Sequence, residues 1–193
     1  MLSLILASLL AVSHAPSESQ VLGLLKRYDL GEPINSVGPI PLAGFKFWRR
    51  VPLGQGRSAV IVSTLWDSGV FFFGPGGRQM NVLKTAEVLR SWTVDLDGDG
   101  IRELVTEERV LRGTGLHEAE FRLYSVTGSG RLLWRGESTA YADAWWKGYA
   151  YDRRSYLRIV KDATHPYLQY RHACGDRECV RRLRVAGGAL FEE

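Results

Sequence analysis

The chain lacks the sequence signatures of the common catalytic sites. It contains no nucleophile elbow, no glycine-rich phosphate-binding loop and no His-Glu-x-x-His metal motif. Its four histidines are isolated from one another in the sequence: His14, His117, His165 and His172. Glu107 and Glu108 are expected on the surface of a strand, and the other conspicuous carboxylates gather in one short loop. These absences favour a protein that is not an enzyme.

The chain also lacks an apolar run long enough to cross a bilayer as a helix, for which about 20 residues are needed. The run Leu2–Val12 is shorter and is followed by small residues, as in a secretory signal peptide. We expect residues 1–15 to be a signal peptide cleaved after Ser13 or Ala15; the alternative is a buried N-terminal helix. Export predicts a secreted or periplasmic protein.

Only two cysteines are present, Cys174 and Cys179, with four residues between them. Gly175 and Asp176 favour a turn there, so a disulfide could join the two arms of a hairpin in an oxidising compartment. A zinc site would need two further ligands, and only His172 is nearby. Redox-active pairs usually have two intervening residues. A structural disulfide is the favoured interpretation.

Neither sign of charge dominates, since the formal net charge is +4. The excess lies in residues 146–193, which carry 10 basic and 6 acidic side chains. In an exported protein such a basic stripe would meet acidic polysaccharide, lipid headgroups or solvent, and we expect no nucleic-acid partner. Arginines that alternate with apolar residues are typical of the solvated face of a strand, which is the favoured interpretation.

The most informative segment of the chain is an oxygen-rich loop. Residues 95–105 read Asp-Leu-Asp-Gly-Asp-Gly-Ile-Arg-Glu-Leu-Val, so Asp95, Asp97 and Asp99 alternate with other residues and Glu103 follows. Hard cations such as Ca²⁺ take six to eight oxygen ligands, and carboxylates in a tight turn supply them. Without a cation, three neighbouring carboxylates would repel one another. The loop therefore predicts a Ca²⁺ site; the alternative is a solvated acidic turn.

This loop differs from an EF-hand, because its twelfth position is Thr106 and its eighth is Arg102. It resembles the Asp-x-Asp-Gly-Asp-Gly-x-x-Glu-Leu calcium loop of the FG-GAP and VCBS repeat families, which joins two strands of a propeller blade. The resemblance covers about eleven residues of loop and about fifty of blade-like context. It implies a ligand set carried over by position: Asp95, Asp97, Asp99, the main-chain carbonyl of Ile101, and Glu103.

Before the β-rich part, residues 16–43 predict one short helix and a Gly/Pro-rich arm. Val21, Leu24, Leu25 and Tyr28 have helical spacing, and Ser17 with Gln20 forms a candidate capping box. Residues 31–43 are rich in glycine and proline. This segment is thus expected to precede the main domain rather than to belong to it.

Residues 44–193 are expected to form a single β domain, because short runs rich in β-branched and aromatic residues alternate with turn signals. Lys84–Arg90 is instead assigned to a helical turn. The expected strands fall into three groups of four: Phe45–Val51, Ala59–Leu65, Val70–Phe73 and Met80–Leu83; Ser91–Val94, Glu103–Leu111, Ala119–Ser125 and Arg131–Glu137; Trp145–Tyr151, Tyr156–Lys161, Tyr167–His172 and Val180–Val185.

Three such groups, each of about fifty residues, predict an all-β fold of propeller-like antiparallel four-stranded units. Propellers usually need four to eight blades to close, and three would leave strand edges exposed. The alternatives are an irregular sandwich or barrel, or self-association through the strand edges.

A second candidate site is an aromatic stretch near residue 145. On a strand, Trp145, Tyr149 and Tyr151 share one face, where they could bind sugar rings or a protein; buried, they would be core. Together with Arg181 and Arg182 they form a candidate ligand face. The core interpretation is the favoured one.

Two classes of function remain. The favoured class is an exported, Ca²⁺-stabilised module that is not catalytic and binds a protein or glycan at the cell surface. The alternative is an exported hydrolase that acts on glycans or phosphoesters through residues scattered in the sequence. A cleft lined by titratable groups would favour the hydrolase, and a flat aromatic or basic face would favour the binding module.

Overall fold

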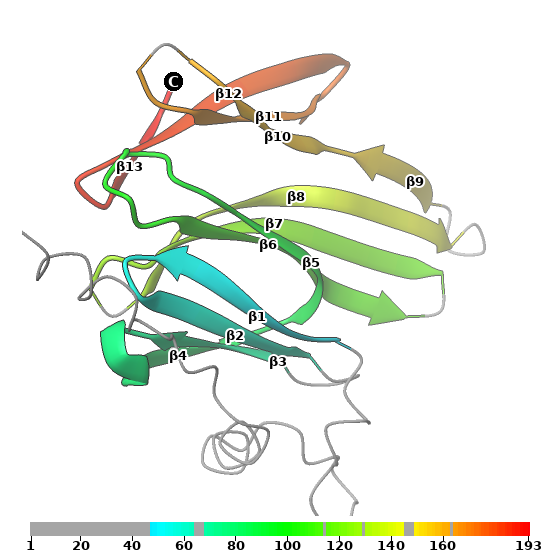
Figure 1. The fold of residues 1–193 in the computed structure, drawn as a ribbon. Coiled ribbons are helices and arrows are strands. Elements are labelled where there is room, and N and C mark those ends of the chain that lie inside the picture. The colour runs from blue at the N-terminus through cyan, green and yellow to red at the C-terminus, as the bar shows by residue number, and fades with distance from the viewer. Residues whose placement is uncertain (1–46, 64–67, 114, 129, 145–148, 163) are drawn as a thin grey trace, which may run out of the picture.

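The computed structural model describes residues 47–193 except 64–67, 114, 129, 145–148 and 163 (Figure 1). The expected signal peptide, the short helix and the arm lie outside the described residues. Trp145 also lies outside them. Among the residues that are described, no helix is long and apolar enough to cross a membrane.

The described part of the chain is all-β and forms three antiparallel sheets, which confirms the expected fold class and its three units. The first sheet contains β1 (Phe47–Gly54), β2 (Arg57–Ser63), β3 (Ser68–Phe73) and β4 (Gln79–Thr85). The middle sheet contains β5 (Glu87–Val94), β6 (Glu103–Gly113), β7 (Leu116–Ser125), β8 (Arg131–Ala144) and β9 (Tyr149–Arg154). The third sheet contains β10 (Tyr156–Val160), β11 (Tyr167–Cys174), β12 (Arg177–Ala186) and β13 (Ala189–Glu192). A short 3₁₀ helix, Pro75–Gly77, lies between β3 and β4.

Each sheet is a meander in which strands consecutive in the chain are hydrogen-bonded neighbours. Tight turns make this arrangement feasible. Gln55 and Gly56 connect β1 to β2, and both have a positive φ (47° and 72°), as type I′ hairpin turns require. Gly175 and Asp176 connect β11 to β12 in the same two-residue manner. The turn residues therefore explain why neighbouring strands pair.

The middle sheet lies between the other two (Figure 1). One core cluster joins it to the first sheet through Leu104 and Tyr124, which pack with Val51, Ile61 and Phe72. A second cluster joins the middle sheet to the third sheet. Its members include, from the middle sheet, Val105, Phe121 and Leu123, and from the third sheet, Leu168, Tyr170 and Leu183. The middle sheet is therefore buried on both faces, as a central layer must be.

The assignment of Lys84–Arg90 to a helical turn is wrong, because these residues belong to the end of β4 and the start of β5. The physical reason lies in tertiary contacts. Val88 is buried in the first core cluster, and the amide of Ala86 donates a 3.1 Å hydrogen bond to Glu108. These contacts are made only when the segment is extended and crosses from one sheet to the next.

The boundary between the second and third groups of strands also differs from the prediction. β8 continues to Ala144, and β9 pairs back along it, so the strand expected to open the third group completes the middle sheet. The third sheet gains a fourth strand at the C-terminus instead, β13, which pairs with β12. Among the strands that the structure describes, none closes a sheet into a barrel, and self-association through the strand edges stays a prediction.

Candidate metal centre and surrounding residues

The oxygen-rich loop connects β5 to β6, two adjacent strands whose ends pair at Val94 and Glu103. This connection folds the chain back on itself within about eight residues. It brings the carboxylate oxygens of Asp95, Asp97 and Asp99 within 4.8 Å of one another. The alternate spacing of the aspartates in the sequence therefore becomes a compact cluster of acidic oxygens.

Hydrogen bonds from the backbone of the loop hold the three carboxylates in place. Each aspartate accepts at least one: Asp95 from the amides of Gly98 (2.7 Å) and Gly100 (3.1 Å), Asp97 from that of Asp99 (3.3 Å), and Asp99 from that of Ile101 (2.7 Å). Amide donors stabilise ionised carboxylates and fix their orientation. The loop thus gathers negative charge on a rigid framework.

Glu103 and Ile101, the other two residues implied as ligands, lie deeper. The side chain of Ile101 is buried in the first core cluster. The Glu103 carboxylate is buried and accepts a 2.9 Å hydrogen bond from the amide of Leu96. Burial raises the pKa of Glu103 to about 7, and the charges of Asp97 and Asp99 contribute. Glu103 therefore ties the start of the loop to its end.

The electrostatics of the cluster are those of a site with excess negative charge. Burial raises the pKa of Asp97 above its usual range, and the neighbouring charges of Asp99 and Asp95 act in the same direction. A divalent cation among the three carboxylates would offset this repulsion. All the side-chain atoms that could ligate a metal here are carboxylate oxygens, which Ca²⁺ prefers. The chemistry of the cluster therefore fits Ca²⁺.

The turn of the first sheet packs directly against this loop. Gln55 donates a 2.7 Å hydrogen bond to the carbonyl of Asp99, and the amide of Arg102 donates a 2.7 Å bond to the carbonyl of Leu53. Gly54 lies so close that a Cβ atom added there would be 2.2 Å from the carbonyl oxygen of Gly100. The loop is therefore a point of contact between the first and middle sheets.

The segment before β11 reaches the loop from the other side. The imidazole of His165 lies over Gly98, where an added Cβ would be 2.6 Å from its Cε1 atom. His165 also borders a cleft of about 350 Å³ beside the loop. The cleft is lined by residues from the loop, the middle sheet and the third unit: Asp97, Asp99, Thr127, His165, Val185, Ala186, Gly187 and Gly188. All three units thus meet around the oxygen-rich loop.

His14 lies outside the described residues, and the other two histidines lie away from the loop. His117 is half-buried on β7 opposite Tyr141, and His172 on β11 stacks on Tyr170 with 4.7 Å between ring centroids. Within the described ranges, no cluster of metal-ligating side chains combines two histidines.

The candidate ligand face is dispersed over several elements. Trp145 lies outside the described residues, as does the side chain of Tyr149. Tyr151 lies half-buried on β9, with Arg153 5.1 Å from the centre of its ring.

Arg181 and Arg182 are consecutive in β12, and consecutive side chains of a strand point to opposite faces. Accordingly Arg181 pairs with Glu192 at 3.0 Å, whereas Arg182 lies over the ring of Tyr167 at 5.5 Å. The two arginines therefore do not share one face.

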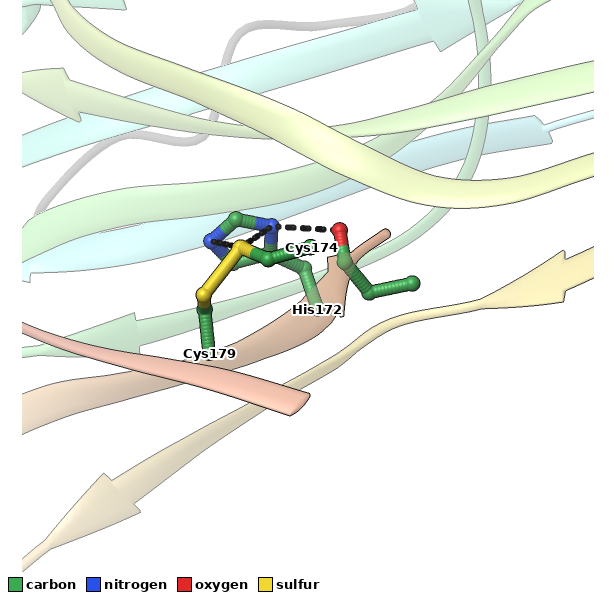
Figure 2. Close-up of a disulfide and its surroundings, with 4 residues drawn as sticks. His172, Cys174 and Cys179 are labelled. Atoms are coloured by element: carbon green, nitrogen blue, oxygen red, sulfur yellow. Dashed lines mark hydrogen bonds between the residues drawn. A yellow bond between two sulfur atoms is a disulfide. The ribbon is translucent and has the colours of Figure 1, made fainter. Parts of the chain in front are cut away.

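Cys174 and Cys179 form the expected disulfide, which closes the hairpin of β11 and β12 with 5.7 Å between the Cα atoms (Figure 2). His172 lies opposite Cys179 in the ladder, and its Nδ1 atom is 3.7 Å from the sulfur of Cys174. These three residues are close enough to suggest a metal site. Because both sulfurs are in the disulfide, neither offers a thiolate, so the pair is structural.

We expect the Cys174→Ser/Cys179→Ser double variant to unfold about 4–8 °C below the native protein. The closed loop is short, so its contribution is about 2 kcal/mol, and each kcal/mol shifts the melting temperature of a chain of this size by about 2–4 °C. Circular dichroism melts with and without reductant measure the difference. Reductant should lower the melting temperature of the native protein and leave the double variant unchanged; an equal response of both would contradict a stabilising disulfide.

Glu107 and Glu108 lie inside the protein, so their expected position on the strand surface is wrong. Glu108 is completely buried, and Glu107 is 8% exposed. Glu107 accepts hydrogen bonds from Arg90 and Ser138, on the face towards the third sheet. Glu108 points the other way and forms a 2.8 Å ion pair with Arg122. Two successive buried glutamates are the consequence of a strand with packed layers on both sides.

Comparison of the chain with models of known protein families, with curated proteins and with solved structures gave no match.

Proposed function

We propose that this chain is an exported calcium-binding module with a non-catalytic binding or structural role at the cell surface. The observation that carries the proposal is the cluster of Asp95, Asp97 and Asp99, whose carboxylate oxygens lie within 4.8 Å of one another. The resemblance of the loop to the calcium loops of FG-GAP and VCBS repeats supports the same ion. The disulfide is consistent with an oxidising compartment.

The role that we assign to the ion is to stabilise the junction of the three units. Gln55 and Leu53 of the first sheet bond to the loop, and His165 covers it from the side of the third unit. When bound, Ca²⁺ would supply positive charge that neutralises the aspartates and fixes the shape of the loop. The loop would then present a fixed surface to both neighbours. No residue of the cluster needs to take part in proton transfer for this role.

We expect Ca²⁺ to raise the melting temperature of the protein relative to chelator. A ligand that binds only the folded state adds about 2.7 kcal/mol of stability at a concentration one hundred times its Kd. For a chain of this size, this corresponds to about 5–11 °C. Calorimetric titration with Ca²⁺ and thermal melts in Ca²⁺ and in chelator measure the two effects.

Asp97→Asn is the variant of choice, since it keeps the shape of the side chain and removes one negative charge. It should abolish the difference between the melts in Ca²⁺ and in chelator. Asp176→Asn is the matched control, because Asp176 is an exposed aspartate in the turn closed by the disulfide. Identical melts of the native protein under both conditions would refute calcium binding. Turnover of glycans or phosphoesters that is lost in a variant of His117, His165 or His172 would instead favour the hydrolase.

A further inference from the structure

The outer face of the third sheet combines arginines with exposed aromatic side chains. Leu168, Tyr170 and Leu183 of this sheet belong to the core cluster shared with the middle sheet. The residues that alternate with them therefore point away from the stack of sheets (Figure 1). The register of the ladders places four arginines and two aromatic residues on this outer face: Arg158, Arg171, Arg182, Arg184, Tyr156 and Phe191.

The register also fixes the spacing of these arginines. Arg158 and Arg182 both pair with Gln169, one on each side, so their backbones lie two strand spacings apart, or about 10 Å. Arg171 and Arg184 flank this row in opposite directions along their antiparallel strands, which makes the basic area about 14 Å long. A single small anion cannot contact groups so far apart, whereas a chain that carries repeated negative charges can.

Arg158 and Arg182 are exposed and form no ion pair with the residues that the structure describes. Arg158 donates a 2.7 Å hydrogen bond to the side-chain oxygen of Gln169, and Arg182 lies over the ring of Tyr167 at 5.5 Å. These contacts position the two guanidinium groups and leave most of their five N–H donors for a ligand. A guanidinium binds a carboxylate through two parallel hydrogen bonds. The two arginines are therefore suited to bind anionic groups.

Two exposed aromatic residues border the arginines. Tyr156 is 63% exposed and pairs with Arg171, and Phe191 is 53% exposed and pairs with Arg184. Large exposed aromatic side chains are common at binding surfaces, where their rings pack against flat apolar groups such as the C–H face of a sugar ring. Each pair thus offers a ring for a sugar beside a guanidinium for its charged substituent.

We propose that the outer face of the third sheet binds an acidic polysaccharide, with Arg158 and Arg182 on its anionic groups and with Tyr156 and Phe191 against its sugar rings. The inference rests on the proposed function, since it names the partner of the exported binding module.

The balance of charge on this face distinguishes the polysaccharide from a nucleic acid or a membrane. Glu178 lies 3.8 Å from Arg171, and Asp162 and Glu193 lie 2.9 and 3.9 Å from Arg184. Four guanidinium groups thus share the face with three carboxylates. Binding to nucleic acid or to anionic lipid depends on the summed charge of many lysines and arginines, which this face lacks. Close contacts with sparse charges and sugar rings depend on it much less.

The test is the affinity of the full chain for hyaluronan and for chondroitin sulfate, measured by calorimetric titration in Ca²⁺. Arg158→Gln with Arg182→Gln should weaken binding at least about tenfold, because charge-assisted hydrogen bonds are lost. Arg78→Gln with Arg135→Gln is the matched control, since it removes the same charge from exposed arginines outside the third sheet. It should change the affinity by less than about twofold, because salt screens distant charges. Equal weakening by both double variants would overturn the inference.

A second measurement uses the native protein alone. Hyaluronan whose carboxyl groups have been reduced to alcohols should bind at least about tenfold more weakly than hyaluronan itself, because the guanidinium groups lose their anionic partners. Binding to neither acidic polysaccharide would overturn the inference. Tighter binding to phosphatidylserine vesicles or to double-stranded DNA would also overturn it, and would identify a membrane or a nucleic acid as the partner.

The melts in Ca²⁺ and in chelator separate this inference from the proposed calcium site. A protein that melts at a higher temperature in Ca²⁺ but binds neither polysaccharide retains the calcium site and loses only the polysaccharide partner. A protein that binds hyaluronan through Arg158 and Arg182 but melts identically in Ca²⁺ and in chelator loses the calcium site and retains this partner.

Discussion

Replacing Glu108 with alanine is expected to lower the free energy of unfolding by about 3–5 kcal/mol, the usual cost of removing one partner of a buried ion pair. The Glu108 carboxylate is inaccessible and lies 2.8 Å from the guanidinium of Arg122. It also accepts 2.6 Å hydrogen bonds from the hydroxyls of Thr106 and Tyr124, and one from the amide of Ala86. Burial raises the pKa of Tyr124, and the charge of Glu108 adds to the effect. The alanine variant would leave two hydroxyl groups without their acceptor and the half-buried guanidinium of Arg122 with only Glu120 as an acidic partner.

Glu120→Ala provides the matched control for Glu108→Ala. Glu120 also pairs with Arg122, at 3.3 Å, but its side chain is 26% exposed and that of Glu108 is not exposed at all. A pair of this kind contributes about 0–1 kcal/mol, because water competes for both charges. Urea unfolding followed by circular dichroism measures both variants. Similar losses for Glu108→Ala and Glu120→Ala would show that burial does not decide the strength of these pairs.

Gly54→Ala is expected to lower the free energy of unfolding by about 2–5 kcal/mol and to weaken the Ca²⁺ binding that we propose. Gly54 has a φ of 87°, which disfavours a residue with a Cβ atom by about 1–2 kcal/mol. The new methyl group would also meet the carbonyl oxygen of Gly100 at 2.2 Å. Because that contact is with the backbone, the turn and the oxygen-rich loop must move apart, at the usual cost of overpacking of about 1–3 kcal/mol.

Gly76→Ala separates the two contributions. Gly76 has a similar φ of 75°, but an added Cβ would meet nothing within 4 Å. This variant should lose only the part of the free energy that comes from the backbone conformation. Urea unfolding and calorimetric titration with Ca²⁺ compare the two glycines. If Gly76→Ala were as destabilising as Gly54→Ala, contact between the first sheet and the loop would not be the cause.

Most of the fold could be predicted from the sequence because its strands carry strong local signals. Runs such as Val70–Phe73 are followed by turn residues, and eleven of the twelve expected strands overlap a strand of their own expected sheet. The helical turn predicted for Lys84–Arg90 is wrong because Val88 and Ala86 are held in an extended segment by contacts with distant residues. β13 carries only four residues, too few to show a clear alternation.

The candidate site could likewise be predicted only in part from the sequence. The close approach of Asp95, Asp97 and Asp99 follows from their spacing in one loop. The contacts of Gln55 and His165 with that loop link segments more than forty residues away in the chain, and no local pattern indicates them.

The burial of Glu107 and Glu108 cannot be predicted from the sequence for a related reason. Two adjacent glutamates suggest a solvated strand, since alternation normally places one of them in water. Only the stacking of a sheet on each face of β6 buries both side chains. To predict that both glutamates are buried, one must know that β6 has a sheet packed on each face, and the sequence does not show this.

The meander within each sheet has a consequence for the order of folding. Every ladder pairs consecutive strands, so each sheet can zip up through contacts that are local in the chain and therefore fast to form. The stacking of the sheets is different, because it depends on contacts between residues that are distant in the chain. The core cluster that contains Val51 also needs Tyr124 and Val126, which are synthesised much later. As a growing chain emerges from its N-terminal end, the first sheet is complete some forty residues before Tyr124 and Val126 have been made. During that interval its apolar inner face is bare, and this is the stage at which a nascent chain most needs protection from aggregation.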